Sequence, residues 1–238
     1  MNFMNSKYTL LSLDYKGTIV AILLGILFFI SGISKTEHYI FSIFFVSSMI
    51  LFLIISFIVT KIGINYKKHL NLYEYKRSIK NVLSNGVPPL IMGLFYFYSN
   101  NPLFIIGFSS VVAAIAADKF SSEIGVLNGA PRLILTFKKV KKGVSGGITL
   151  LGSLSGLLGS MAVSLFSIAY FYFIIPFNTI SLLLIFFILL LSGFCGTIID
   201  SILGYFENKG IGTKHITNFI ASLGAGFIGT ILFLLIVH

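Results

Sequence analysis

Three acidic residues stand where apolar segments of the chain end. Asp118 and Glu123 lie in the stretch AADKFSSEIG at residues 116–125, and Asp200 closes the run LLSGFCGTIID. A carboxylate in such a position costs a few kcal/mol unless it contacts a cation, a hydrogen-bond donor or water. Small and hydroxyl-bearing residues share the helical faces of Asp118 and Asp200. This pattern suits a hydrated cation such as Mg²⁺, which keeps several waters and often shares its ligand shell with phosphates.

Asp118, Glu123 and Asp200 are therefore predicted to be catalytic residues that bind Mg²⁺. Glu123 follows Asp118 by five residues, which is about 140° around an ideal helix. Either the helix breaks between them or the two acids border a shared groove. Two alternatives need no metal: Glu123 pairs with Lys119, its i, i+4 neighbour, and Asp118 and Asp200 pair with other helices or cap them.

The segment PRLILTFKKVKKGVSGGITLLGSLSG, residues 131–156, joins basic residues to glycines just before an apolar helix. Glycines let backbone N–H groups approach an anion, and the helix start adds free amides and the positive end of its dipole. The segment is predicted to bind substrate phosphates through Arg132, Lys138, Lys139, Lys141, Lys142, Ser145, Gly146 and Gly147. Alternatively, the basic residues hold the loop on the cytoplasmic side and contact anionic lipid head groups.

Amide side chains form two further polar columns. Asn81 and Asn85 are spaced i, i+4 ahead of a Gly-Val-Pro-Pro sequence, and Asn218 lies in the last apolar run. These amides are expected either to orient a substrate or to link helices by hydrogen bonds, and helix packing is favoured for Asn218. Ser201, next to Asp200, completes the predicted substrate-binding set.

The elements that must position these residues are membrane helices. The chain has 238 residues, of which 56% are hydrophobic and 10% charged. Several of its apolar runs have the length of roughly 17 to 25 residues that is needed to cross a bilayer. The sequence predicts an all-α, polytopic membrane helical bundle of about seven spans. We expect them at residues 17–34, 39–60, 86–99, 102–117, 149–175, 179–199 and 216–237. The third and fourth are short, so a re-entrant pair is an alternative there.

The basic residues test this count. With seven crossings, all of the 17 Lys and Arg residues except Lys35 fall on one side. Because cytoplasmic loops are enriched in Lys and Arg, the N-terminus is predicted to be cytoplasmic and the C-terminus external, in the cell membrane. Residues 1–238 are expected to form a single integral membrane domain. Its cytoplasmic loops, 61–85, 118–148 and 200–215, are expected to form the active-site face.

Composition and missing motifs remove several function classes. The net charge of +10 is explained by the sidedness of the loops, so no nucleic-acid partner is expected. The sequence contains no CxxC, no HExxH and no Walker-type GxxxxGK[ST] motif, its four histidines are widely spaced, and Cys195 is its one cysteine. Zinc chemistry, P-loop hydrolysis and an intrachain disulfide therefore lose support.

Four stretches resemble the family of integral membrane proteins that includes plant phytyl-phosphate kinase and its archaeal and bacterial relatives. They are SIKNVLSNGVPP, AADKFSSEIG, the basic-glycine segment above and GTIIDSILGYFENKGIGTKHITNFIASLGAG. Together they cover most of the chain from residue 77 onward, in the family's order. The family pattern has a hydroxyl residue where this chain has Lys119. A weaker similarity to CDP-diacylglycerol synthases and polyprenol kinases implies CTP as the nucleotide.

The resemblance implies a CTP-dependent kinase that converts an isoprenyl monophosphate, such as phytyl or geranylgeranyl phosphate, to the diphosphate. The expected partners are CTP or another nucleoside triphosphate, a prenyl phosphate and membrane lipid, with Mg²⁺ as the cofactor. A membrane cytidylyltransferase that makes a CDP-lipid would use the same residues. An ion-coupled transporter, with Asp118 and Asp200 as ion sites, is a second alternative, although the basic loop on one face does not favour it.

Overall fold

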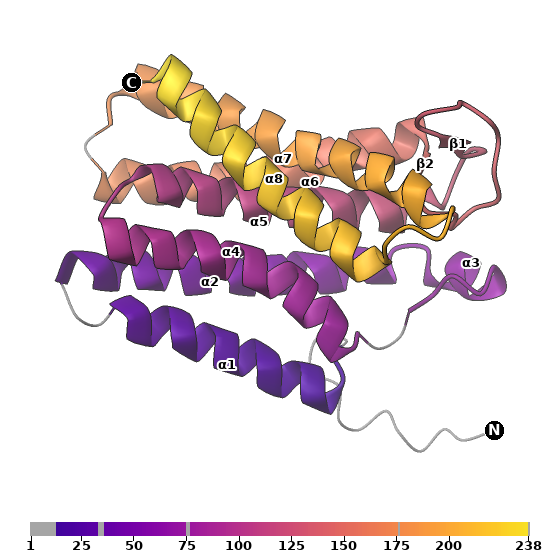
Figure 1. Ribbon diagram of the computed structural model, residues 1–238, viewed down its shortest axis with the longest axis horizontal. Helices are drawn as coiled ribbons and strands as arrows, with labels where there is room; N and C mark the ends of the chain where they lie inside the picture. The colour runs from indigo at the N-terminus through magenta and orange to yellow at the C-terminus, as the bar shows by residue number, and fades with distance from the viewer. Residues whose placement is uncertain (1–12, 33–35, 75–76, 176, 238) are drawn as a thin grey trace.

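The computed structural model describes residues 13–32, 36–74, 77–175 and 177–237, which form an almost entirely helical bundle (Figure 1). Its long helices are α1 (Tyr15–Gly32), α2 (Thr36–Lys61), α4 (Ile79–Ser99), α5 (Leu103–Gly125), α6 (Leu150–Ile174), α7 (Thr179–Glu207) and α8 (Lys214–Ile236). The short elements are α3 (Ile64–His69), β1 (Arg132–Leu133) and β2 (Gly147–Ile148). The predicted all-α membrane bundle is confirmed.

The long helices alternate in direction along the bundle. The start of α1, the end of α2, the start of α4 and the end of α5 lie at one end, together with α3, β1 and β2 (Figure 1). The start of α6, the end of α7 and the start of α8 complete this end, and α8 finishes at the opposite one (Figure 1). All three of the segments that we expected to form an active-site face therefore meet at one end of the bundle.

In the described part of the chain, six helices are long and apolar enough to cross a membrane. The remaining long helix, α4, has 21 residues and contains Pro88 and Pro89, both buried. At about 1.5 Å per residue it is roughly 31 Å long, close to the thickness of a hydrocarbon core. A tight turn at residues 100–102 reverses the chain into α5. The structure thus agrees with about seven spans and places α4 beside α5 along the bundle.

Three helices extend further than the predicted spans. α4 begins at Ile79 instead of residue 86, α5 ends at Gly125 instead of residue 117, and α7 ends at Glu207 instead of residue 199. Hydropathy stops a span at its first charged or amide side chains, but here those side chains face protein groups and cavities within the bundle. The helix therefore does not break between Asp118 and Glu123.

The centre of the bundle is α5, whose segment from Ile105 to Ala117 is entirely buried. Alanines and serines on α5 let glycines of α6 and α7 approach closely. A Cβ added at Gly159 of α6 would lie 2.7 Å from the carbonyl oxygen of Ala116. A Cβ added at Gly193 of α7 would lie 2.7 Å from Cβ of Ala113. The buried small residues of α6 thus form a helix-packing surface; they are Gly152, Ser155, Gly156, Gly159 and Ser160.

Candidate functional site

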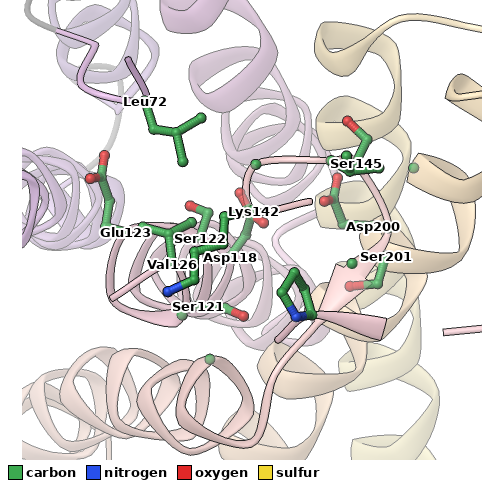
Figure 2. Close-up of a pocket in the computed structure, with 18 of the residues that line it drawn as sticks. Leu72, Asp118, Ser121, Ser122, Glu123, Val126, Lys142, Ser145, Asp200 and Ser201 are labelled. Carbon is green, nitrogen blue, oxygen red and sulfur yellow. The ribbon is translucent and has the colours of Figure 1, made fainter. Parts of the chain in front are cut away.

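A polar cavity of about 330 Å³ lies at the end of the bundle where the loops meet (Figure 2). Its walls come from α3 and the linker after it, the last turns of α5 and α7, the first turn of α8, and the loop between β1 and β2. This volume falls within the range of about 300 to 1,000 Å³ that is typical of small-molecule sites. The cavity gathers residues that lie more than a hundred positions apart in the sequence.

Thr149 fixes two walls of this cavity relative to each other. Its hydroxyl accepts a hydrogen bond from the backbone N–H of Gly152, 3.0 Å away, and so caps the start of α6. The same hydroxyl donates to the carbonyl oxygen of Gly125 at the end of α5, 3.1 Å away. One side chain therefore satisfies free backbone groups of two helix ends.

Asp118 of α5 and Asp200 of α7 meet at the floor of the cavity. Their carboxyl groups are close enough to share a hydrogen bond. With its amide oriented to satisfy both partners, Asn218 of α8 donates to Asp200 Oδ1 (3.1 Å) and to the carbonyl oxygen of Lys214 (2.8 Å). Two carboxylates in contact repel each other unless a cation or a proton lies between them. Asp118, Asp200 and Asn218 thus lie together although they come from three different helices.

This donor set suits a magnesium ion only together with outside ligands. No group of three His, Cys, Asp or Glu side chains within the described residues could hold a metal ion. Mg²⁺ is nevertheless commonly bound by one or two carboxylates, with water and substrate phosphates completing its octahedral shell. Asp118 and Asp200 provide those two carboxylates, and the cavity leaves room for the remaining ligands.

Glu123 lies apart from this pair, one to two turns nearer the end of α5 (Figure 2). Its carboxylate accepts a hydrogen bond from Lys67 Nζ of α3 at 2.6 Å, forms an ion pair with Lys119 and accepts a weaker bond from Thr60. The side chain of Lys67 is only 1% exposed, so this charge pair is largely removed from water. The Glu123–Lys119 pair that we considered as an alternative is therefore present. A metal-ligand role for Glu123 stays a prediction.

Arg77, just before α4, adds a second buried cation next to this ion pair. Its guanidinium donates to the hydroxyl groups of Ser56 (2.7 Å) and Thr60 (2.8 Å) on α2. Burial lowers the pKa of Arg77 from its ordinary value, and the negative charge of Glu123 opposes that shift. Thr60 connects the Arg77 side chain to the Lys67–Glu123 ion pair, because its hydroxyl also donates to Glu123.

Of the five basic residues predicted to bind phosphate in and beside the loop between β1 and β2, one lines the cavity. Lys142 lies at the rim, where its Nζ donates to the hydroxyl of Tyr66 at 2.8 Å. The other four basic residues predicted to bind phosphate are exposed and do not line the cavity; they are Arg132, Lys138, Lys139 and Lys141. A phosphate-binding role for these four stays a prediction.

The glycines of this loop allow it to lie directly on α7. Gly146 has a positive φ of 73°, and a Cβ at this position would lie 2.6 Å from the backbone nitrogen of Tyr205. Beside it, the Ser145 hydroxyl donates to Glu207 at 3.1 Å, and the Asn208 amide donates to the Ser145 carbonyl oxygen. Both contacts tie the loop to the end of α7. Gly147 and Ser201 also line the cavity, and their role in substrate binding stays a prediction.

Gly143, Ser145 and Gly147 have the G-x-S-x-G spacing of a hydrolase nucleophile elbow. That motif requires a sharp turn between a strand and a helix, with a histidine within reach of the serine. Here the serine lies in the loop before β2, its hydroxyl bonds to Glu207, and no histidine is among the described residues that line the cavity. The geometry does not fit a serine hydrolase.

Two cavity lysines were missed by sequence reasoning. Lys214 at the start of α8 lies near enough to Asp118 and Asp200 to stabilise their negative charges, and it also forms a 3.8 Å ion pair with Glu74. Lys67 contacts Glu123 from 56 positions away in the sequence. The spacing of Lys214 one helical turn before Asn218 was a usable signal. Nothing local in the sequence marks Lys67.

Asn81 and Asn85 do not line the polar cavity. Both border a separate, mostly apolar cavity of about 110 Å³ among α1, α2 and α4. Asn85 also borders a third, very small cavity of about 10 Å³ together with Asp118, Asp200 and Asn218. Asn85 therefore lies beside the acid pair, whereas Asn81 borders only the apolar cavity.

Comparison with known proteins supports this description of a membrane protein. The family described as "Integral membrane protein DUF92" matches residues 2–224. The membrane protein MJ0933 of Methanocaldococcus jannaschii is 37% identical over 184 residues, which are 76% of this chain and 73% of that protein. Protein PGR of Arabidopsis thaliana is 43% identical over 96 residues, or 39% of this chain and 33% of PGR. No solved structure matches.

Proposed function

We propose that this chain, which belongs to the DUF92 family of integral membrane proteins, is a magnesium-dependent enzyme that transfers the γ-phosphoryl group of CTP to an isoprenyl monophosphate. The family resemblance expected from the sequence is confirmed by a plant and an archaeal relative. The transfer reaction, the nucleotide and the acceptor are the proposal. The observation that carries it is the contact between Asp118 and Asp200 at the floor of a polar cavity whose rim holds lysines.

In the proposed reaction, an oxygen of the acceptor phosphate attacks the γ-phosphorus of CTP. The bond between that phosphorus and the β–γ bridging oxygen breaks, and CDP leaves with its electron pair. The acceptor oxygen is already anionic, so the site needs positioning and charge neutralisation more than a general base. The choice of CTP follows the similarity to CTP-using membrane enzymes.

Residues of this chain have separate roles in the proposal. Asp118 and Asp200 hold Mg²⁺, which when bound neutralises charge on the transferring phosphoryl group. Asn218 keeps the carboxylate of Asp200 oriented through its amide. Lys142 and Lys214, which both line the cavity, neutralise the nucleotide phosphates. Glu123 holds the side chains of Lys67 and Lys119 in place in the cavity wall.

Product analysis with purified protein tests this function. The protein is incubated with Mg²⁺, with CTP, ATP or GTP, and with phytyl or geranylgeranyl monophosphate, and the nucleotide and lipid products are separated. We expect CDP and a prenyl diphosphate in equal amounts. Release of pyrophosphate together with a CDP-lipid would contradict the kinase and identify a cytidylyltransferase. Absence of any nucleotide product with every acceptor would contradict both enzymes.

A further inference from the structure

The second cavity, among α1, α2 and α4, has walls suited to a hydrocarbon chain. Its volume is about 110 Å³, and most of its lining side chains are apolar, among them Leu24, Phe28, Met49 and Phe52. Gly25 of α1 also lines it, and a Cβ at that position would have no neighbouring atom within 4 Å. The backbone of α1 thus leaves open space on this side.

One end of this cavity is polar. Arg77, Asn81 and Asn85 line it, and they lie at or near the start of α4, on the same end of the bundle as the polar cavity. Among the residues that the structure describes, none forms a hydrogen bond with the amide side chain of Asn81 or Asn85. Unpaired amides beside a cation provide donors for an anionic group. The cavity is therefore amphipathic along its length.

Asn85 joins this cavity to the acid pair. Together with Asp118, Asp200 and Asn218 it borders the third cavity, which at about 10 Å³ separates the other two. Asp118, Asp200 and Asn218 in turn line the polar cavity. A molecule whose charged end lies at Asn85 is thus next to the acid pair on the side opposite the loop.

We infer that the cavity among α1, α2 and α4 binds the isoprenyl chain of the acceptor, with the acceptor phosphate held by Arg77, Asn81 and Asn85. This inference rests on the proposed function. It means that acceptor and nucleotide approach the acid pair from opposite sides, the acceptor from the bilayer side and the nucleotide from the loop side. The enclosed space is small, so it surrounds only the isoprene units nearest the phosphate, and the rest of the chain extends into the lipid.

A phospholipid of the bilayer is the competing occupant. Its head group would also contact Arg77, but it carries two acyl chains, whereas about 110 Å³ encloses only part of one. A phosphate monoester also presents more free oxygens to the guanidinium and the two amides than a phosphodiester does. The shape and the donors of the cavity therefore favour a single-chain phosphate monoester.

Photolabelling tests this assignment. The probe is geranylgeranyl monophosphate with a diazirine near its first isoprene unit, added to the full chain in nanodiscs. We expect cross-links on α1, α2 and α4 that excess unlabelled geranylgeranyl monophosphate prevents. Gly25→Leu, which fills the open space, is expected to weaken probe binding by roughly tenfold or more. Leu23→Phe adds bulk to α1 at a side chain that is 52% exposed, and it should leave binding unchanged.

Asn85→Leu serves as a second variant, since it removes the amide and keeps the branched shape of the side chain. It should weaken binding of the phosphate probe and leave binding of an equivalent geranylgeraniol probe unchanged. Cross-links on α6 to α8, full labelling of Gly25→Leu, or competition by phosphatidylglycerol alone would overturn the inference. Turnover of prenyl phosphate without labelling of these helices would overturn it while leaving the proposed function intact. If the protein shows no turnover of prenyl phosphate and no labelling of these helices, both the inference and the proposed function are contradicted.

Discussion

At the scale of single residues, the acid pair differs from the third acid in what surrounds it. Asp118 and Asp200 contact each other and an amide, whereas Glu123 is held by Lys67 and Lys119. Because Glu123 is already paired with two lysines, its contacts in this structure stabilise the fold. Two carboxylates that contact each other need a cation or a proton. The substitutions of these residues are therefore expected to have opposite effects on stability and activity.

Replacing Asp200 with Asn should abolish most transfer activity while the protein stays folded. The substitution removes a ligand charge at nearly constant volume, and we expect a loss on the order of 10²-fold or more in kcat. Rates are measured with CTP and geranylgeranyl monophosphate at low millimolar Mg²⁺. The matched control is Asp14→Asn, since Asp14 caps the start of α1 away from the cavity and Asn is an equally good cap. Near-normal activity of Asp200→Asn would mean that Asp200 only contacts neighbouring helices.

Replacing Glu123 with Gln should destabilise the protein. It leaves Lys67, which is 1% exposed, without its 2.6 Å carboxylate partner, a loss that costs about 3 to 5 kcal/mol for a buried pair. Glu74→Gln breaks the exposed pair with Lys214 and should change stability by less than about 1 kcal/mol. Equilibrium unfolding in detergent compares the two. Equal stability of both variants would contradict a structural role for the Glu123 pair.

The sequence predicts the two acids of the pair as site residues, but it does not predict the lysines and loop contacts around them. Asp118 and Asp200 stand out because a charge at the end of an apolar run is costly, wherever the partner lies. The Lys67–Glu123 contact joins positions 56 apart, and no spacing rule predicts it. The sequence also does not predict that Lys138, Lys139 and Lys141 are exposed, because the direction of a loop side chain depends on how the loop packs on α7.

At the scale of elements, close packing of glycine-bearing helices on α5 aligns the acids. The Gly159 face of α6 contacts the backbone of α5 at Ala116. Hydropathy predicted these helices well because their lipid-facing and buried sides are both apolar. It predicted their ends poorly, because the polar last turns of α5 and α7 are stabilised by contacts inside the cavity.

Replacing Gly159 with Ala should destabilise the bundle by about 1 to 3 kcal/mol, a typical cost of overpacking. The added Cβ would lie 2.7 Å from a backbone oxygen, which has no freedom to move aside. Gly25→Ala is the matched control, since nothing lies within 4 Å of its added Cβ. The control should be neutral or slightly stabilising, because Ala favours helix over Gly. Unfolding in detergent measures both, and a neutral Gly159→Ala would contradict tight packing of α6 on α5.

At the scale of the whole molecule, the polar cavity, the polar end of the second cavity and the basic loops lie at one end of the bundle. The predicted orientation places this end in the cytoplasm, where nucleotides are available. Because α1 starts and α8 ends at opposite ends of the bundle (Figure 1), the two termini are expected on opposite sides of the membrane.

Reporters fused at the two termini test this orientation. A reporter placed before Met1 should be cytoplasmic, and one placed after His238 should be external. A cytoplasmic reporter at both ends would contradict seven crossings and leave α4 as the first candidate for a segment that does not span. The opposite result at both ends would reverse the orientation and place the polar cavity outside the cell.

The central claim is that Asp118 and Asp200 bind a cation together with a nucleotide. Thermal unfolding of wild type and Asp118→Asn, each with and without Mg²⁺ and CTP, tests it most directly. Without ligand, Asp118→Asn should be as stable as wild type or slightly more stable, since repulsion within the acid pair is relieved. Mg²⁺ with CTP at a hundredfold excess over Kd should stabilise wild type by about 2.7 kcal/mol and the variant hardly at all. A variant that unfolds earlier without ligand, yet keeps the full ligand-induced shift, would contradict the claim and leave the acid pair as a structural contact.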